Sequence, residues 1–285
     1  MLHGRGTSDR PSVLYTLPKR DGAGPSGGEE TENGTMTRET TQKAYVAYRV
    51  RRFLQIGWLC ATAHGEPPAT PIVAPPSVVD DINREFLNPE LNPDEWLAKF
   101  EIESREVFAA RKEIITAVGL EPGDRIADVG SGTGLYLAAF SAAVGPAGRV
   151  YAVDISPRLT EFIERRIRDE KLGNVATVRS TPTSTTLQPD SVTHAFVCDA
   201  YHHFDRYPEM LASIHAALQP GGELVVVDFD RIPGVSREWL LTHVRADKKT
   251  VRKEIEAADF RFVEDVPVAA FKENYLLRFR KPRSE

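Results

Sequence analysis

Short apolar runs alternate with amphipathic stretches along the second half of the chain. We predict strands where apolar residues follow one another between polar turns, and helices where they recur three or four positions apart. The predicted strands cover residues 126–130, 149–154, 175–180, 193–199 and 222–229. The predicted helices cover residues 92–118, 133–144, 157–171 and 207–218. Because the two kinds of element alternate and the strands are apolar almost throughout, the pattern favours a parallel sheet with helices on both faces.

The pattern changes toward the C-terminus. Residues 247–259 have helical spacing, whereas residues 261–266 and 275–280 alternate between apolar and polar positions. Such alternation is typical of half-buried strands, and two strands joined by a short loop pair antiparallel. We therefore predict a doubly wound α/β fold, whose mostly parallel seven-stranded sheet carries an antiparallel C-terminal strand pair.

The N-terminal third carries little of this pattern. Residues 1–42 are rich in Gly, Ser, Thr and Glu, which predicts a disordered tail. Residues 43–91 hold a proline-rich linker and, before it, a segment that resembles a secretory signal, with arginines, a short apolar run and a small-residue site near Ala63. Export would require translation to start at Met36, and a cytoplasmic protein is the competing and favoured interpretation. The folded domain is expected to cover residues 92–285.

The composition of the chain limits which classes of molecule it is expected to bind. The chain of 285 residues has a formal net charge of −5, so no basic field favours nucleic acid binding. No apolar stretch approaches the roughly 20 residues of a membrane-spanning helix. Cys60 and Cys198 lie far apart without Cys or His at metal-ligand spacing, so we expect neither a disulfide framework nor a structural zinc site. The oligomeric state is not indicated.

The most informative motif is Asp128-Val129-Gly130-Ser131-Gly132-Thr133-Gly134, which joins a predicted strand to a predicted helix. Gly130 allows a tight turn, Gly132 lets a ligand approach the backbone, and Gly134 lets helix and strand pack closely. Exposed amides at a helix N-terminus favour an anionic group. Leu135 stands where a dinucleotide-binding G-x-G-x-x-G motif needs glycine, and a Walker loop is missing. A small zwitterion, with Asp128 orienting its ammonium group, fits better than a dinucleotide.

The second predicted strand ends at Asp154. A carboxylate at this strand tip accepts hydrogen bonds from a ribose diol, in nicotinamide and adenosyl cofactors alike. Asp154 therefore indicates a nucleoside without choosing between the two cofactors. The structural alternative for this carboxylate is to cap the helix that opens at Ser156-Pro157.

The order DVGSGTG, VYAVDIS and LQPGGELVVVDF closely resembles class I S-adenosylmethionine-dependent methyltransferases, over residues 95–280. CDAYHHF, at the end of the fourth predicted strand, makes the chain look most like members that act on small molecules. The resemblance implies S-adenosyl-L-methionine as cofactor and a small-molecule methyl acceptor. It assigns the cofactor contacts to Asp128, Gly130, Ser131, Gly132, Thr133, Gly134, Asp154, Ile155, Thr181 and Asp199. Thr181 stands in place of the aspartate that many relatives carry near the adenine.

Polar side chains follow the fourth predicted strand. Because open α/β sheets bind ligands beyond the carboxyl ends of their strands, we expect Asp199, Tyr201, His202 and His203 to face the acceptor. These four are the candidate catalytic residues. His203 is the favoured one, and it would orient and deprotonate a hydroxyl or amine. The structural alternative is that one histidine caps a helix and the other packs.

Further candidates follow the fifth strand and precede the first. Asp228 is placed to hold a metal with Asp199, but it is followed by Phe229 where metal-dependent relatives carry asparagine, so we expect no metal. Three residues are candidates for the substrate pocket, with surface salt bridges as their alternative: Arg231, His243 and Arg245. Three aromatic residues before the first strand are expected to be core more often than substrate contacts: Trp96, Phe100 and Phe108.

Three other functions fit parts of this pattern. A nicotinamide-dependent oxidoreductase is opposed by Leu135 and by the antiparallel tail. A non-catalytic S-adenosylmethionine-binding module would keep the loop without turnover. A nucleic acid methyltransferase is opposed by the acidic balance and by the lack of an Asn/Asp-Pro-Pro-Tyr motif at the fourth strand. The sequence indicates neither the acceptor nor the atom that is methylated.

Overall fold

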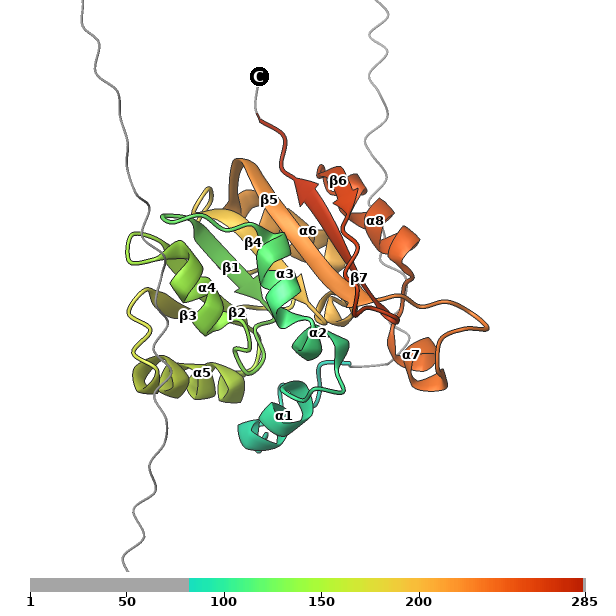
Figure 1. Ribbon diagram of the computed structural model, residues 1–285, viewed down its shortest axis with the longest axis horizontal. Coiled ribbons are helices and arrows are strands. Elements are labelled where there is room, and N and C mark those ends of the chain that lie inside the picture. The colour runs from blue at the N-terminus through green and yellow to red at the C-terminus, as the bar shows by residue number, and fades with distance from the viewer. Residues whose placement is uncertain (1–81, 284–285) are drawn as a thin grey trace, which may run out of the picture. The chain divides into compact units, whose positions relative to one another are not determined.

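A seven-stranded sheet runs through the centre of the residues that the computed structural model describes, 82–283 (Figure 1). The strands are β1 (Arg125–Val129), β2 (Arg149–Asp154), β3 (Val175–Arg179), β4 (Val192–Cys198), β5 (Leu218–Phe229), β6 (Arg261–Asp265) and β7 (Asn274–Arg280). Their order is β3-β2-β1-β4-β5-β7-β6, and β1 to β5 pair parallel. β7 runs antiparallel to β5 and β6. The doubly wound fold and the antiparallel C-terminal pair are confirmed.

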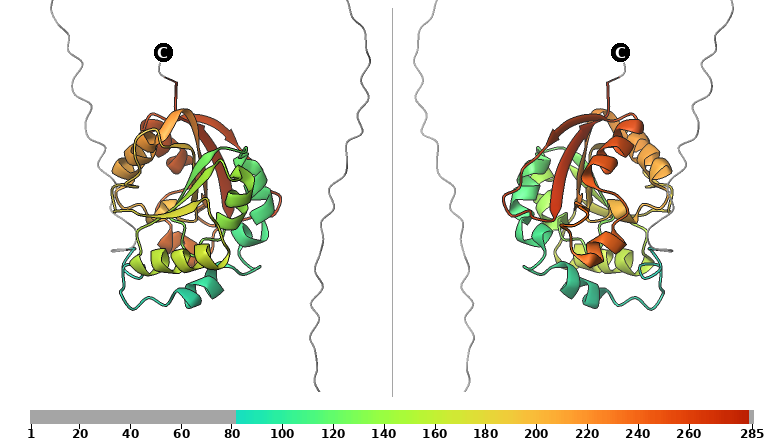
Figure 2. Two further views of the ribbon diagram at one scale, coloured as in Figure 1. Left: turned by 90° about the vertical axis from the view of Figure 1, so that its left-hand side faces the viewer. Right: turned by 90° about the vertical axis from the view of Figure 1, so that its right-hand side faces the viewer.

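Helices cover both faces of this sheet (Figure 2). They are α1 (Pro93–Phe100), α2 (Glu106–Ala109), α3 (Arg111–Val118), α4 (Leu137–Val144), α5 (Pro157–Asp169), α6 (Tyr207–Ala217), α7 (Glu238–His243) and α8 (Lys248–Ala257), with a 3-10 turn η1 (Tyr201–His203) after β4. α3, α4 and α5 contribute to one buried apolar cluster, and α6 and α8 to another. Ile126 belongs to the first cluster, whereas Ala127 and Val129 belong to the second. β1 is therefore apolar along its length because both of its faces are buried.

The helix predicted over residues 92–118 is broken into three pieces. Asn92 caps α1 as expected, because its side chain accepts a hydrogen bond from the amide of Asp94. The chain then leaves helical geometry between Glu101 and Arg105 before α2 and α3 follow. The break lets Glu101 and Arg105 reach Arg166 and Asp199, respectively. Apolar spacing alone does not reveal such long-range polar contacts.

Two smaller differences concern the helices. Residues 133–136 form a turn, so α4 begins at Leu137 and not at residue 133. Gly134 has a φ of +85°, which is incompatible with a right-handed helix. α7 was not predicted, because its six residues are too short for a clear periodic signal.

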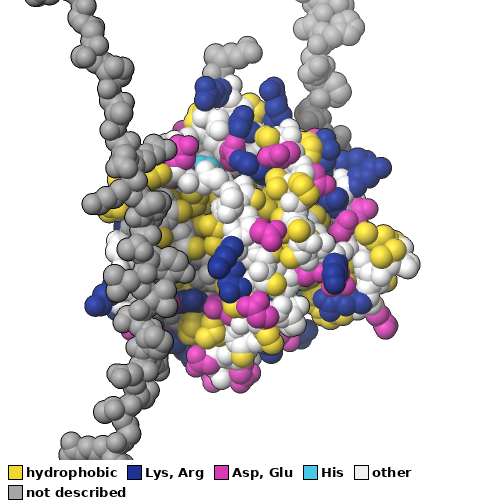
Figure 3. Space-filling model, viewed as in Figure 1, with side chains coloured by type: hydrophobic (Ala, Val, Ile, Leu, Met, Phe, Trp, Pro, Cys, Tyr) yellow, Lys and Arg dark blue, Asp and Glu magenta, His cyan; other side chains and the backbone are white. Residues whose placement is uncertain are grey.

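Residues 82–91, which the sequence pattern assigns to the linker, pack onto the domain. Ile82 and Leu91 are buried, and the side chain of Asn83 donates a hydrogen bond to the backbone oxygen of His203 at 3.0 Å. The predicted tail, the signal-like segment and the proline-rich stretch lie outside the described residues. No helix within residues 82–283 is long and apolar enough to cross a membrane. Acidic and basic side chains are mixed over the face shown in Figure 3.

Candidate active site

A cavity of about 860 Å³ lies beyond the carboxyl ends of the central strands. The loops after β1, β2, β3, β4 and β5 line it, together with residues between positions 82 and 107 and the start of β7. Nearly all cofactor candidates from the sequence line this cavity: Asp128, Gly130, Ser131, Gly132, Thr133, Asp154, Ile155, Thr181 and Asp199. Because one continuous space holds these residues and both histidines after β4, a cofactor and a second molecule have room to meet.

Gly130 and Gly132 shape the loop after β1. Gly130 has a φ of +78°, and a Cβ there would lie 2.5 Å from the Cβ of Ala200. Gly132 has a φ of +57° and faces the ring of Phe100. Any side chain at Gly130 would therefore strain the backbone and displace the segment after β4. Gly134 does not line the cavity, and its missing side chain serves close packing against Leu137.

The backbone amides of the loop after β1 have hydrogen-bond partners within the protein, which the motif did not predict. The amides of Gly130 and Ser131 donate to the backbone oxygen of Val153, at 2.8 and 3.1 Å. The amide of Gly132 donates to the Oδ2 atom of Asp154 at 2.8 Å. These three donors are already engaged, so they do not form the free anion cradle that the motif predicts. Gly130 and Gly132 line the cavity without side chains, so they leave room there although their amides are engaged elsewhere.

Asp128 is a buried carboxylate at the floor of the loop. Its side chain is 2% exposed, and its Oδ2 atom has no hydrogen-bond partner. Burial, with a smaller contribution from the charge of Asp154, raises the pKa of Asp128 to about 8. A buried acceptor without a donor is costly, and a ligand with an ammonium group would supply the missing donor and charge.

Asp154 ends β2 and braces two segments. Its Oδ2 atom accepts from the amide of Gly132 and its Oδ1 atom from the amide of Ser156, each at 2.8 Å. Burial raises the pKa of Asp154 to about 6, although these hydrogen bonds and Arg179 oppose the shift. Ser156 itself caps α5. Asp154 lines the cavity, and each of its oxygens can accept a further hydrogen bond, so these contacts are compatible with a hydrogen bond from a ligand hydroxyl.

Asp199 follows β4 with a φ of +47°, an unusual conformation for a residue other than glycine. Arg105 donates to its Oδ2 atom at 2.5 Å, and Asn274 donates to its Oδ1 atom at 2.8 Å. Burial raises the pKa of Asp199 to about 6, and Arg105 opposes this. Sequence reasoning missed Arg105 and Asn274, since they come from the break after α1 and the start of β7, with no local motif.

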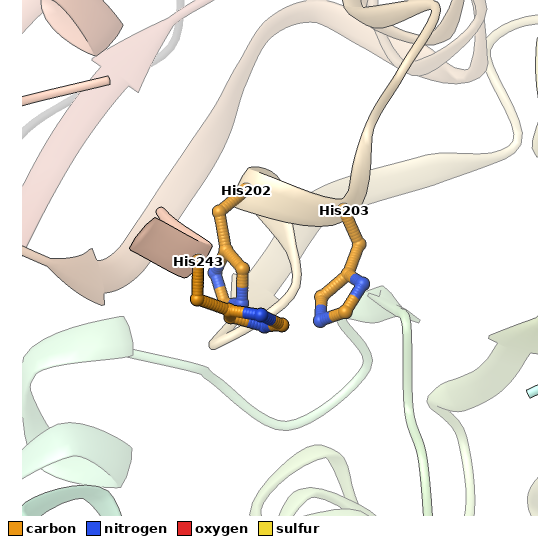
Figure 4. A group of neighbouring side chains, drawn as sticks. All are labelled: His202, His203 and His243. Carbon is orange, nitrogen blue, oxygen red and sulfur yellow. The ribbon is translucent and has the colours of Figure 1, made fainter. Parts of the chain in front are cut away.

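Three histidines that line the same cavity lie close together (Figure 4). His202 is buried, and its Nδ1 atom lies 2.7 Å from Oδ1 of Asp228, whose Oδ2 accepts from the His202 amide at 3.0 Å. Burial and the two neighbouring histidines hold the pKa of His203 well below its usual range, and its Nδ1 atom has no hydrogen-bond partner. Burial also lowers the pKa of His243, which lies at the end of α7. His203 and His243 are therefore neutral at pH 7.

Several candidates from the sequence lie elsewhere. Tyr201 does not line the cavity, and its hydroxyl donates to Glu254 at 2.9 Å within the core. Tyr201 is therefore not placed to act on an acceptor in the cavity, because its ring belongs to a buried apolar cluster of the core. Arg245 pairs with Glu254 in a buried ion pair, and Arg231 donates to the backbone oxygen of Leu241. Neither arginine lines the cavity.

Aromatic side chains enclose the cavity. Phe86 and Trp96 pack with ring centroids 4.7 Å apart, and Trp96 packs on Phe100 at 5.1 Å. On the histidine side, Trp239 stacks on His243 at 4.6 Å. Trp96 and Phe100 line the cavity, whereas Phe108 does not. We expected these three aromatics to be core more often than substrate contacts; each is only partly buried, and two of them border the cavity.

An ion pair connects the end of α1 to the loop after β1. We call α1 and Glu101 the cover, because Trp96 and Phe100 of α1 line the cavity. Nη1 of Arg166, in α5, donates to Oε1 of Glu101 at 2.6 Å and to the backbone oxygen of Thr133 at 3.1 Å. The hydroxyl of Thr133 donates to the same Glu101 oxygen at 3.1 Å. Both charged side chains are mostly buried, at 21% and 17% exposed, so the contact is less screened than a surface pair.

Comparison with known proteins places these features in context. A family model for a methyltransferase domain matches residues 126–222. The ubiquinone/menaquinone biosynthesis C-methyltransferase UbiE of Pseudomonas entomophila is 32% identical over 117 residues, which are 40% of this chain and 44% of that protein. The demethylmenaquinone methyltransferase of Geobacillus kaustophilus is 25% identical over 118 residues, 41% of this chain and 50% of that protein. The matches therefore cover about half the length of these curated relatives.

Solved structures share the fold more completely. A SAM-dependent methyltransferase from Aquifex aeolicus superposes with a TM-score of 0.59 at 22% identity, covering 67% of this chain and 98% of that one. Phosphoethanolamine N-methyltransferase 2 of Haemonchus contortus, solved with S-adenosyl-L-methionine, gives a TM-score of 0.57 at 16% identity over 73% of this chain and 60% of that one. At this level of identity the similarity shows the fold.

Proposed function

We propose that this chain, which carries a methyltransferase domain of the class I S-adenosylmethionine-dependent type, transfers a methyl group from S-adenosyl-L-methionine to a small aromatic acceptor. The observation that carries the proposal is the unpartnered, buried oxygen of Asp128 in a cavity that continues to the aromatic and histidine side chains. The first part fits the cofactor's ammonium group, and the second offers a place for the acceptor.

The residues around the loop fit the cofactor. Asp128 would take its ammonium group and Asp154 its ribose diol, with Ile155 and Thr181 beside the adenine. Thr181 fits a weaker contact, because its hydroxyl is exposed and lies near Thr183 and Ser184. When bound, the cofactor supplies a methyl group on a sulfonium, and displacement of that methyl leaves a neutral thioether.

Because the leaving group is neutral, the protein mainly has to position the acceptor. Alignment of two reactants supplies up to about 7–11 kcal/mol in favourable cases. Asp199, held by Arg105 and Asn274, fixes the loop after β4 between the two halves of the cavity. His203 is a neutral imidazole with an unused nitrogen, suited to accept a proton from a hydroxyl or amine.

The chemistry of the walls supports an aromatic acceptor. Phe86, Trp96 and Phe100 on one side and Phe229 and Trp239 on the other offer flat apolar surfaces. Aromatic pairs gain about 0.5–1.5 kcal/mol beyond the burial of their area, so ring-bearing molecules are favoured over aliphatic ones of the same size. The curated relatives are named for quinone biosynthesis, in keeping with a ring-bearing acceptor here.

Calorimetry with three ligands tests the cofactor assignment first. We expect S-adenosyl-L-methionine and S-adenosylhomocysteine to bind with one site per chain, and NAD not to bind. A folded sample that binds NAD alone would contradict the proposal. Incubation with methyl-labelled cofactor and a panel of phenols, quinols and aliphatic alcohols, read by mass spectrometry, then tests the acceptor. Transfer to aliphatic members only would contradict the aromatic assignment and leave the cofactor assignment standing.

A further inference from the structure

His202, His203 and His243 converge from two elements that lie far apart in the chain. His202 and His203 belong to η1, and His243 ends α7. One ring nitrogen of each lies within 4.8 Å of those of the other two (Figure 4). Ordinary packing brings rings together, but it does not require three imidazole nitrogens to face one another.

Asp228 sets the ring orientation of His202. With its Nδ1 atom 2.7 Å from the Oδ1 atom of the carboxylate, the His202 ring is held by Asp228, and Nε2 is the nitrogen left for a ligand. Asp228 is itself held in place, because the amides of His202 and Phe229 donate to its oxygens. A carboxylate on the far nitrogen of a histidine is the usual support of a metal-binding imidazole in proteins.

From this geometry we propose that His202, His203 and His243 bind one divalent transition-metal ion at the acceptor end of the cavity. Imidazole suits zinc, iron, nickel and copper, and three protein ligands with an open position are typical of catalytic rather than structural sites. Ligand nitrogens about 2.0–2.1 Å from an ion lie roughly 3.3 Å apart, so the rings must draw together. His243 can do so, since it ends a short helix and is only partly buried.

Phe86 packs on His203 and Trp239 stacks on His243, and both aromatic residues line the cavity where the acceptor is proposed to lie. The role of the ion rests on the proposed function: it would orient an oxygen or nitrogen of the acceptor and make its proton more acidic. In the metal-bound protein His203 is a ligand and no longer a base, so the ion takes over the activation of the acceptor. The existence of the site does not depend on that role.

Titration of the full, tag-free chain with Co²⁺ tests the site without cofactor or acceptor. Visible absorption of Co²⁺ reports nitrogen ligands, and we expect one equivalent to bind with bands that zinc displaces. Asp228→Asn removes the hydrogen-bond partner of a ligand and should weaken Co²⁺ binding by roughly 10–100-fold. His243→Gln removes a ligand itself and should weaken Co²⁺ binding by more than this. His215→Gln is the matched control, because His215 packs on Phe260 away from the cavity.

If a variant fails to fold, the Co²⁺ spectrum of the wild-type protein is still sufficient to test the metal site. Wild-type protein that shows no Co²⁺ bands, or equal Co²⁺ affinity in wild type and a folded His243→Gln, would overturn the metal site. S-adenosyl-L-methionine binding, measured in the same samples, keeps the two proposals apart. Cofactor binding without Co²⁺ binding rejects only the metal site, whereas Co²⁺ binding without cofactor binding rejects only the methyltransferase proposal.

Discussion

Asp128 shows how a single buried side chain links cofactor binding to stability. In the unfolded chain its pKa is near the ordinary 3.8, whereas burial raises it to about 8 in the folded protein. Between these values the folded protein keeps a proton that the unfolded chain has lost. The free energy of unfolding therefore falls as pH rises through this range, and the contribution is fully present only below it.

Asp128→Asn removes this dependence. Relative to the variant, we expect the wild type to lose up to about 1.4 kcal/mol of stability per pH unit between pH 5 and 8. Urea unfolding of both proteins at several pH values measures the difference. A wild-type–variant gap that stays constant with pH would mean that Asp128 is ionised throughout the range. The same variant should lose most of its affinity for S-adenosyl-L-methionine, because no charge then faces the ammonium group.

Asp154→Ala should weaken binding of S-adenosylhomocysteine by about 2–3 kcal/mol, from lost hydrogen bonds to a charged group. Asp154 also braces Gly132 and Ser156, so loss of affinity alone does not prove a ribose contact. A 2′-deoxy analogue separates the two roles in calorimetry. Wild type should discriminate against the analogue and Asp154→Ala should not. Equal discrimination by both would assign Asp154 to bracing only.

His203→Ala should lower turnover at least tenfold while leaving cofactor affinity within a factor of about two, since its ring lines the cavity where we propose that the acceptor binds. Steady-state kinetics and calorimetry on the same sample make the comparison, with His215→Ala as control. Parallel losses of turnover and cofactor affinity would instead indicate a structural role for His203.

Among the elements, the contact of Arg166 with Glu101 and Thr133 joins α5, the cover and the cofactor loop. Arg166→Gln should raise the Kd for S-adenosyl-L-methionine several-fold, because the cover and loop are then held less firmly. Arg168→Gln is the matched control, as Arg168 is exposed on the same helix. Equal Kd values in the two variants, measured by calorimetry, would show that this contact does not organise the site.

The strands and the loops after them also show which features could be predicted from the sequence and which could not. Four of the parallel strands, β1, β2, β4 and β5, were predictable as apolar runs because both of their faces are buried, as at Ile126 and Ala127 in β1. Asp128 and Asp154 were found because they sit at fixed offsets within local motifs. Arg105 and Asn274 were not, because only the folded chain brings them to Asp199. Tyr201 was expected to face the acceptor but lies in the core against Glu254, a long-range contact that the residues around it in the sequence do not reveal.

At the scale of the whole molecule, the folded domain starts earlier than residue 92. Ile82 and Leu91 are buried, and burial of an aliphatic side chain contributes about 1.5–3 kcal/mol. A chain that starts at residue 92 should therefore melt several degrees below one that starts at residue 79, at ~2–4 °C per kcal/mol. Differential scanning calorimetry compares the two. Matching melting temperatures would place residues 82–91 outside the cooperative unit.

The place of β7 has a consequence for how the protein matures. β7 lies between β5 and β6 in the sheet, and the side chain of Asn274 at its start donates a hydrogen bond to Asp199 in the cavity. A nascent chain on the ribosome can pair its five parallel strands early, but β7 cannot take its position between β5 and β6 until residues 274–280 have emerged. Truncated translation products are therefore expected to lack a finished cavity, so that methyl donor is not engaged by incomplete chains.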